Sequence, residues 1–424
     1  MKKQLVLTPL EDARSGRLMF LLCFTFYFLL YCGRLNYSAA LAEITTTGFL
    51  EKDAAGLIST AFFVTYGCGQ FVNGFISDRM PPFGMVTLGI LGAGLMNAAM
   101  YFALSAGLGL AAYIFIWALN GYIQSMVWPT MIRIVSNILP ERMRVTAGVS
   151  MLATTAVGTV LSYLLSTLIM SAAGWRECFL VPGLILISAA LIWFAVTRPI
   201  SRRTLSVVEV SEPLGSREKP SSGGEPILPL LLSSGALLML LPIGFFAIIK
   251  DGITTWTPTI ITETFFTSPE LSTLLTTVIP LISIFGAAVS KLVMDKWLHD
   301  ELASSAFMFL LSAAGLFAII ALGSTNLILT LLLLALVITF MLGINTMFIS
   351  LVPLRFGKYG RSATMTGILN STAAVCCGIS TYLVGLLAKG SGWGIVFKVF
   401  LVLSLLGGGV SFALIRRWRR FKAK

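Results

Sequence analysis

Long apolar runs alternate with short polar segments along almost the whole chain. Examples are residues 18–30, 84–102 and 327–342, and each run ends at charge, glycine or proline. A helix that crosses a bilayer needs about 20 mostly apolar residues, so the pattern predicts twelve membrane-spanning helices. The predicted ranges are 18–41, 54–76, 84–105, 109–136, 145–170, 177–197, 228–257, 272–294, 302–322, 327–353, 363–388 and 395–415.

Composition supports a membrane protein and excludes a large soluble enzyme domain. Of the 424 residues, 57% are hydrophobic and 11% are charged, whereas a soluble domain carries about 25% charged residues. The six cysteines form no CxxC pair and His299 is the only histidine. We therefore expect no metal site, no disulfide framework and no cofactor. With no nucleophile beside a base and no phosphate-cradling loop, we also expect that the protein is not an enzyme.

The net charge of +12 is explained by membrane topology. If the N-terminus is cytoplasmic, 24 of the 30 basic residues fall on the cytoplasmic side, which is the positive-inside bias. We therefore expect a multi-pass protein of the bacterial inner membrane with both termini in the cytoplasm, touching anionic lipids and not nucleic acid. The first residues lack a small-residue cleavage site and are interpreted as a cytoplasmic tail.

One long polar stretch, rich in Pro, Ser, Gly and charge, divides the apolar runs six and six. It predicts a cytoplasmic linker between two bundles. The predicted organisation is a cytoplasmic tail 1–17, an N-terminal six-helix bundle 18–197, a linker 198–227, a C-terminal six-helix bundle 228–415 and a basic cytoplasmic tail 416–424.

The two halves also share an internal repeat. Four features recur at offsets of 216 to 218 residues: Arg34 with Lys250, Asp78-Arg79 with Asp295-Lys296, Arg144 with Arg361, and Gly174-Trp175 with Gly392-Trp393. This predicts an all-α membrane protein of two six-helix bundles duplicated in parallel. That architecture resembles the major facilitator superfamily, in which a site lies between the halves near the membrane mid-plane.

Two cations inside predicted spans are the main candidates for chemistry. Arg34 and Lys250 stand at equivalent places of the two halves, and a charged residue in mid-span costs at least about 2.5–3.5 kcal/mol. Together they could clamp a doubly charged or bidentate anion. The alternative is neutralisation by a protein carboxylate, with Glu43 and Asp251 nearest in sequence. Consecutive helical residues point about 100° apart, so we expect Lys250 and Asp251 to pair poorly.

Tyr27 and Tyr31 precede Arg34 by seven and three residues. This spacing places all three on one helix face and offers two hydroxyl groups beside the cation. The alternative is that the two rings only pack between helices.

Three strings carry a resemblance to a family. The segment NGYIQSMVWPTMIR (120–133), the spacing Tyr27-x3-Tyr31-x2-Arg34-x-Asn36 and the spacing Lys250-x-Gly252-x3-Trp256-x-Pro258 resemble helices 4, 1 and 7 of the organophosphate:phosphate antiporter family. The resemblance implies that Arg34 and Lys250 hold phosphate while an organic phosphate or phosphonate is exchanged for inorganic phosphate by alternating access. We also expect a monomer. The predicted substrate-binding residues are Arg34, Lys250, Tyr27, Tyr31, Gln124, Trp128, Thr155 and Asn370.

The chain departs from that family at several positions. Lys250 replaces the usual arginine of helix 7 and loses its bidentate fork. Gln70 stands where the family has a lysine, and Thr155 stands where glycerol-phosphate carriers have a histidine. Thr366 and Leu369 replace the acid and lysine pair of hexose-phosphate carriers. We therefore expect a substrate other than simple glycerol 3-phosphate or glucose 6-phosphate.

Two alternative functions stay open. One is a proton-coupled symporter of an organic carboxylate, with Asp251 carrying the proton because a desolvated carboxylate binds protons more readily. The other is a transporter-like membrane sensor, which would keep the same binding residues.

Charged residues near helix ends are candidates for coupling or gating. We expect Asp78 to form a charge lock with Arg133 or Arg144; the alternative is that these are solvated loop charges. The full set of predicted coupling and gating residues is Asp251, Asp78, Arg79, Arg133, Arg144 and Asp295.

Overall fold

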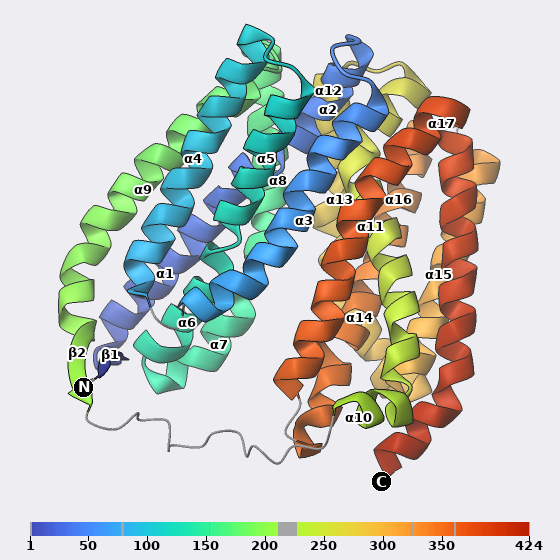
Figure 1. Ribbon diagram of the computed structural model, residues 1–424. Helices are drawn as coiled ribbons and strands as arrows, with labels where there is room; N and C mark the ends of the chain where they lie inside the picture. The colour runs from blue at the N-terminus through green and yellow to red at the C-terminus, as the bar shows by residue number, and fades with distance from the viewer. Residues whose placement is uncertain are drawn as a thin grey trace. The chain divides into compact units, whose positions relative to one another are not determined.

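The computed structural model describes residues 2–77, 80–151, 153–210, 227–323, 325–359 and 362–423, which are mainly helical (Figure 1). Ten of its helical segments are long and apolar enough to cross a membrane. The last segment, Met365–Ala423, contains two helices that meet at Gly392, whose φ of 72° breaks the helix. The predicted helical membrane fold is confirmed, apart from one short two-stranded sheet, and the count of twelve spans stays a prediction.

The chain divides into two compact units. Unit 1 comprises Met1–Thr47, Ala61–Ser216 and Pro269–Thr277, and unit 2 comprises Gly48–Thr60, Arg217–Ser268 and Val278–Lys424. Helix α3 (Lys52–Ser77) therefore begins in unit 2 and continues in unit 1.

The other elements of unit 1 are β1 (Lys2–Leu7), α1 (Ala13–Leu30), the 3-10 turn η1 (Tyr31–Gly33), α2 (Asn36–Thr46), α4 (Pro82–Ala106), α5 (Leu110–Gln124), α6 (Val127–Ile138), α7 (Glu141–Met151), α8 (Ala153–Ala172), α9 (Glu177–Thr204), β2 (Leu205–Val210) and α12 (Pro269–Thr276).

The other elements of unit 2 are α10 (Ile227–Ser234), α11 (Ala236–Phe265), α13 (Val278–Ser283), α14 (Gly286–Val293), the π-helix η2 (Met294–Leu298), α15 (Glu301–Leu322), α16 (Leu327–Asn345), the π-helix η3 (Thr346–Leu351), the 3-10 helix η4 (Val352–Tyr359) and α17 (Ser362–Ala423).

Unit 1 packs its helices through buried aromatic side chains and turns apolar side chains outward. Helices α4 and α9 lie against each other (Figure 1), and the indole of Trp193 on α9 donates to the carbonyl of Phe83 on α4 at 3.1 Å. At the surface Phe115 is 69% exposed and Leu191 is 61% exposed. Large apolar side chains on the outside are stable when acyl chains replace water around the helices.

The N-terminal segment forms a strand that the sequence analysis did not predict. Strand β1 pairs antiparallel with β2, with Lys2 opposite Val210 and Leu7 opposite Leu205. The backbone continues this attachment, because the N–H of Leu10 donates to the carbonyl of Ile138 at 2.8 Å. Six residues are too few for a clear periodic signal, and the partner strand lies some 200 residues away in sequence.

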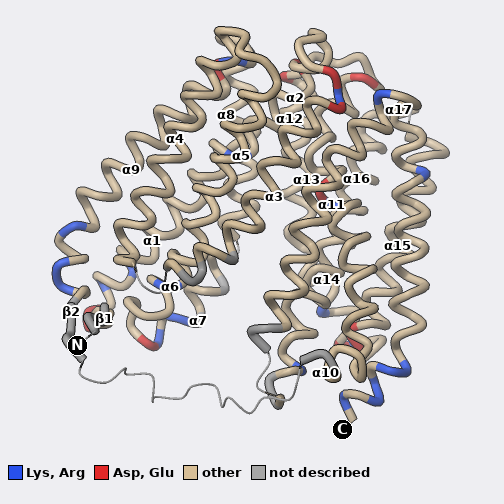
Figure 2. Tube along the Cα trace, viewed as in Figure 1, with Lys and Arg blue, Asp and Glu red and all other residues tan. Residues whose placement is uncertain are grey.

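Charge is gathered at the ends of the long helices. In Figure 2 the long segments are mostly tan, and Lys and Arg mark the ends near β1, β2 and α7 in unit 1 and the C-terminal end of α17 in unit 2. This arrangement within each unit agrees with spans whose middle parts face lipid or protein.

A cluster of ion pairs explains why the first turn of α3 packs in unit 2. Lys52 Nζ lies 2.7 Å from Oε2 of Glu263 on α11, and the indole of Trp393 on α17 donates to the same oxygen at 2.9 Å. Lys389 on α17 pairs with Asp53 at 3.1 Å and also with Glu51. Gly385 permits the contact, since an added Cβ would lie 2.4 Å from the carbonyl oxygen of Lys52.

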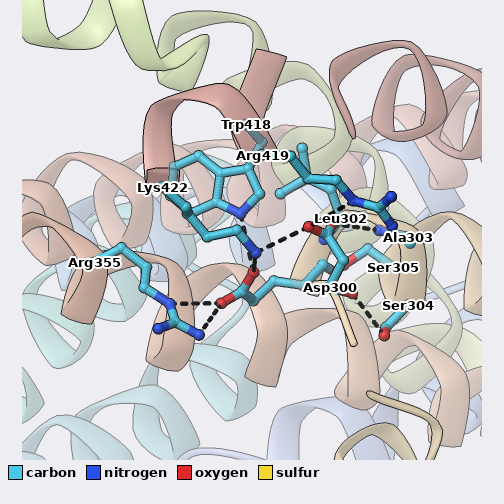
Figure 3. Close-up of polar contacts among 10 residues, drawn as sticks. Asp300, Leu302, Ala303, Ser304, Ser305, Arg355, Trp418, Arg419 and Lys422 are labelled. Carbon is cyan, nitrogen blue, oxygen red and sulfur yellow. Dashed lines mark hydrogen bonds and ion pairs between the residues drawn. The ribbon is translucent and has the colours of Figure 1, made fainter. Parts of the chain in front are cut away.

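A second network surrounds two carboxylates at the start of α15, and we call it the Glu301 network (Figure 3). Asp300 and Glu301 are each 1% exposed. Glu301 accepts from Arg355 Nε on η4 at 2.7 Å, from the indole of Trp418 at 3.0 Å and from Lys422 Nζ at 2.6 Å. Asp300 caps α15, accepting from the N–H groups of residues 302 and 303 at 3.1 Å, and also pairs with Lys422. The network ties the end of α17 to α15 and η4 within unit 2.

Candidate functional site

The first predicted span is interrupted where its arginine stands. A continuous helix over 18–41 is wrong, because α1 ends at Leu30, η1 covers Tyr31–Gly33 and α2 begins at Asn36. An added Cβ at Gly33 would lie 2.5 Å from Leu186 Cδ1 and 2.8 Å from Asn97 Nδ2. The backbone at Gly33 therefore approaches α4 and α9 more closely than a side chain would permit.

The break exposes a carbonyl group that side-chain amides satisfy. The carbonyl of Gly33 accepts from Asn97 Nδ2 at 2.9 Å, from Gln124 Nε2 at 2.9 Å and from Asn120 Nδ2 at 3.3 Å. In an apolar surrounding, a carbonyl without a partner would cost several kcal/mol. These amides from α4 and α5 hold the turn that carries Arg34.

Arg34 is held by an amide and by aromatic faces. Its Nε donates to Gln124 Oε1 at 3.0 Å. The guanidinium carbon lies 4.8 Å from the ring centroid of Tyr31 and 4.5 Å from that of Tyr66 on α3. The buried Nη2 finds no hydrogen-bond partner among the described residues, and none of their carboxylates pairs with Arg34. The guanidinium thus keeps its full positive charge and an unused donor.

The structure brings four further predicted side chains together at this place. The rings of Tyr27 and Tyr31 have centroids 5.8 Å apart, and Tyr27 lies 4.8 Å from Trp128 on α6. The hydroxyl of Tyr31 donates to Thr155 Oγ1 on α8 at 3.1 Å. The predicted set in unit 1 is therefore contiguous, and its role in binding stays a prediction.

Sequence reasoning missed Tyr66 at this site. The phenol ring faces Arg34, and its hydroxyl accepts from Gln70 Nε2 at 3.0 Å. The sequence offered one signal: Tyr66, a polar aromatic residue, stands four positions before Gln70 in the same predicted span. That spacing puts both side chains on one helix face.

Lys250 and Asp251 form an ion pair on α11, which contradicts the expectation that they pair poorly. Lys250 Nζ lies 2.8 Å from Asp251 Oδ1, and the side chains are 25% and 19% exposed. The angle between consecutive Cα–Cβ bonds is overcome by the four methylene groups of lysine, which let the ammonium bend toward its neighbour. The thiol of Cys377 on α17 lies beside the same carboxylate.

Close packing of α11 against α17 sets the position of this pair. An added Cβ at Gly252 would lie 2.8 Å from Phe400 Cζ and 2.9 Å from Ser380 Oγ. The hydroxyl of Ser380 donates to the carbonyl of Ile248 at 2.7 Å, and the indole of Trp256 donates to the carbonyl of Thr381 at 3.1 Å. Asn370 on α17 is exposed and makes no hydrogen bond within the part of the chain that the structure describes.

The predicted gating residues have separate surroundings. Arg133 Nη1 donates to the carbonyl of Met80 at 2.9 Å, and Arg144 Nε donates to the carbonyl of Leu139 at 2.9 Å. Asp295 is exposed on η2. Asp78 and Arg79 lie outside the described residues, so the expected charge lock stays a prediction.

Comparison with known proteins agrees with this architecture. The sequence profile of the Major Facilitator Superfamily matches residues 23–381. A solved structure of a bacterial homologue of the human lysosomal transporter Spinster superposes with a TM-score of 0.70 at 14% identity, covering 97% of this chain and 96% of that one. At that identity the likeness concerns the fold.

Several curated relatives match, and two of them illustrate matches over part of the length. The membrane sensor protein UhpC of Salmonella typhimurium is 32% identical over 177 residues, which is 41% of this chain and 39% of that protein. A probable hexose phosphate transport protein of Chlamydia muridarum is 27% identical over 161 residues, 38% of this chain and 34% of that protein. The chain thus spans between a third and two fifths of these relatives. The predicted likeness to phosphate-ester carriers is confirmed.

Proposed function

Because the chain belongs to the Major Facilitator Superfamily, a family of transporters, we propose that it exchanges an organophosphate or a phosphonate for inorganic phosphate by alternating access. Its membrane is the bacterial inner membrane, with both termini in the cytoplasm, and it works as a monomer. The predicted halves 18–197 and 228–415 are the moving bodies.

One observation carries this proposal. The guanidinium of Arg34 has a buried donor without a partner among the described residues and no carboxylate among them to neutralise it. A buried cation without a carboxylate partner is stabilised strongly when an anion binds to it. The donors of arginine also match the geometry of phosphate oxygens. The rings of Tyr31 and Tyr66 lie beside the guanidinium and support its positive charge.

In the proposed mechanism Arg34 and Lys250 both bind the phosphate group. The amides of Gln124 and Asn120 keep the interrupted helix and Arg34 in place. The rings of Tyr27 and Trp128 contact each other and would provide an apolar wall for the organic part of the substrate. The name of the hexose phosphate relative supports a phosphate ester as substrate.

The test is counterflow in liposomes that contain the purified protein. Radiolabelled inorganic phosphate should enter faster when unlabelled phosphate is present inside, and phosphate esters outside should compete. Arg34→Ala should remove this uptake while the protein remains folded. A well-folded Arg34→Ala protein with normal uptake would show that the anion binds elsewhere.

A second function is favoured by one relative. The match to a protein named as a membrane sensor supports a chain that binds a phosphate ester and signals without moving it. A protein that is stabilised against heat by phosphate esters but exchanges none of them would fit this function, because a ligand stabilises whatever state it binds.

A further inference from the structure

Helix α3 is shared between the two compact units. Its residues up to Thr60 belong to unit 2, and its residues from Ala61 onward belong to unit 1. The helix is continuous across this boundary, since residues 57–66 are all α-helical and include neither proline nor glycine. A sharp bend in a helix normally needs proline, a π-bulge or a Gly/Ser pair. A movement of one unit against the other therefore has to detach one part of α3 from the unit that holds it.

The longer part of α3 is packed closely in unit 1. The hydroxyl of Thr65 donates to the carbonyl of Ala118 on α5 at 2.6 Å. An added Cβ at Gly121 on α5 would lie 2.3 Å from the carbonyl oxygen of Phe62, so the two helix backbones approach each other as closely as glycine permits. The first turns of α3, which belong to unit 2, are therefore the part that has to detach.

The equivalent place in the second half of the chain is built differently. Helix α12 begins at Pro269, 217 residues after Lys52, which is the offset of the internal repeat. It belongs to unit 1, and the next helix, α13, belongs to unit 2. The helix is interrupted at Thr277, because Pro280 has no N–H to donate to the carbonyl of Thr276. This interruption provides a hinge that the continuous helix α3 lacks.

The first turns of α3 are held in unit 2 by polar contacts. The hydroxyl of Thr60 donates to the carbonyl of Gly378 on α17 at 2.6 Å and lies 2.9 Å from Thr381 Oγ1. An added Cβ at Gly56 would lie 2.6 Å from the carbonyl oxygen of Thr381. The side chain of Glu51, just before α3, is 67% exposed and lies outside the candidate spans. Polar contacts have modest net stability because water replaces a lost partner, so this attachment suits repeated opening.

We propose that residues 52–60 of α3, which we call the α3 clasp, detach from α11 and α17 in every transport cycle, and that Glu263 determines how readily they do so. This inference rests on the proposed function, since it assigns contacts that have to open for alternating access. It goes beyond that function because it names the residues that hold one state and assigns the hinge of the equivalent segment to Thr277.

Glu263 connects the three helices that meet at the clasp. Its Oε2 accepts from Lys52 Nζ on α3 at 2.7 Å and from the indole of Trp393 on α17 at 2.9 Å. Lys52 Nζ also lies 5.3 Å from the ring centroid of Trp393. Glu263→Gln keeps the shape of the side chain and loses its charge. We expect this variant to raise the population of the open clasp about tenfold, as for the loss of one charge-assisted contact.

A reversible disulfide tests whether the clasp opens during transport. Because the side chains of Thr60 and Thr381 meet, Thr60→Cys combined with Thr381→Cys brings two thiols within reach of a disulfide. Phosphate–phosphate exchange by this full-length double variant in liposomes should stop after oxidation and return after reduction. The two single variants, oxidised in the same way, control for the native cysteines and should keep their exchange. Exchange that continues in the cross-linked protein would overturn the proposal.

Thiol labelling measures how often the clasp opens. Ser59 is buried and follows Lys52 by seven residues, which places it on the same helix face. Ser59→Cys is labelled with a water-soluble maleimide in detergent, and the labelling of the same protein without this substitution is subtracted. Glu263→Gln should raise the rate about tenfold, and Lys52→Gln should act alike because it removes the same ion pair. Glu141→Gln, which removes an exposed carboxylate at the start of α7, should leave the rate unchanged.

The two measurements separate this inference from the proposed function. Wild-type protein that exchanges no phosphate contradicts the proposed function, and labelling then decides on the clasp. If labelling still increases in both Glu263→Gln and Lys52→Gln, the clasp opens in a ligand sensor as well. Labelling that stays at the wild-type rate in both variants would show that Glu263 does not hold the clasp and would contradict the inference itself.

Discussion

Arg34 Nε donates to Gln124 Oε1 at 3.0 Å, while the same amide donates through Nε2 to the carbonyl of Gly33 at 2.9 Å. One side chain of α5 therefore satisfies a backbone carbonyl at the break in the first span and also fixes the orientation of Arg34. Gln124 is fully buried, so its geometry is fixed by these contacts and not by solvent. The amide is neutral, which leaves the guanidinium charge available to an anion.

The first prediction exchanges the arginine for lysine. Arg34→Lys keeps a positive charge but loses the Nε contact to Gln124 and the planar donor fork. We expect kcat/KM for phosphate exchange to fall by about 100-fold, as for the loss of hydrogen bonds to a charged group. Melting temperature should change little. Exchange within about threefold of wild type would mean that a point charge suffices there.

The second prediction concerns a carboxylate placed beside Arg34, as Asp251 lies beside Lys250. Gln124→Glu places a carboxylate against Arg34 and should remove phosphate binding by neutralising the cation. Gln124→Leu is the matched control, because it also loses the donor to Gly33 without adding charge. Thermal stabilisation by inorganic phosphate is the measurement. We expect the glutamate variant to bind inorganic phosphate at least about tenfold more weakly than the leucine variant.

The third prediction concerns the departure from the related family. Lys250→Arg restores a forked donor and should shift preference toward phosphate esters, since two parallel hydrogen bonds suit a phosphate. Lys250→Gln should weaken all anions and leave Asp251 without its ion pair. Competition assays against phosphate exchange report both effects. If selectivity and affinity stay as in wild type in both variants, Lys250 has a structural role only.

The fourth prediction concerns stability and not transport. Glu301 is almost fully buried and accepts from Trp418, Lys422 and Arg355. Lys422→Met removes one cation from this carboxylate and should lower the free energy of unfolding by about 3 kcal/mol. Trp418→Phe removes a single hydrogen bond and should cost about 1 kcal/mol. Thermal unfolding in detergent measures both, and equal melting temperatures for the two variants and wild type would show that the Glu301 network adds no stability.

The amino-acid pattern predicted the membrane class and most spans, because apolar length is a property of single segments. The role of Arg34 and Lys250 stays a prediction. The pattern did not predict the break at Gly33. An interrupted helix keeps the same apolar composition, and the amides that stabilise the break come from α4 and α5. The predicted span 109–136 is likewise divided, into α5 and α6. Two consecutive helices keep the apolar composition of one long helix, so the division could not be predicted.

Side-chain pairing was harder to predict than location. The angle between consecutive Cα–Cβ bonds led us to expect that Lys250 and Asp251 would pair poorly. The structure shows an ion pair, because the lysine side chain is long enough to bend toward its neighbour. Glu301 was missed because its partners Trp418 and Lys422 stand some 120 residues later in the chain. Tyr66 was missed because its helical spacing to Gln70 does not reveal that Arg34, on another helix, lies against its ring.

In the proposed mechanism, phosphate moves only in exchange for another anion at Arg34. Liposomes containing the protein, loaded either with inorganic phosphate or with a phosphate-free buffer, are given radiolabelled phosphate outside, with and without a pH gradient. We expect rapid uptake into phosphate-loaded liposomes, little uptake into phosphate-free ones under either condition, and loss of uptake in Arg34→Ala. Uptake into phosphate-free liposomes driven by the pH gradient alone, and lost in Asp251→Asn, would contradict it and identify a proton symporter.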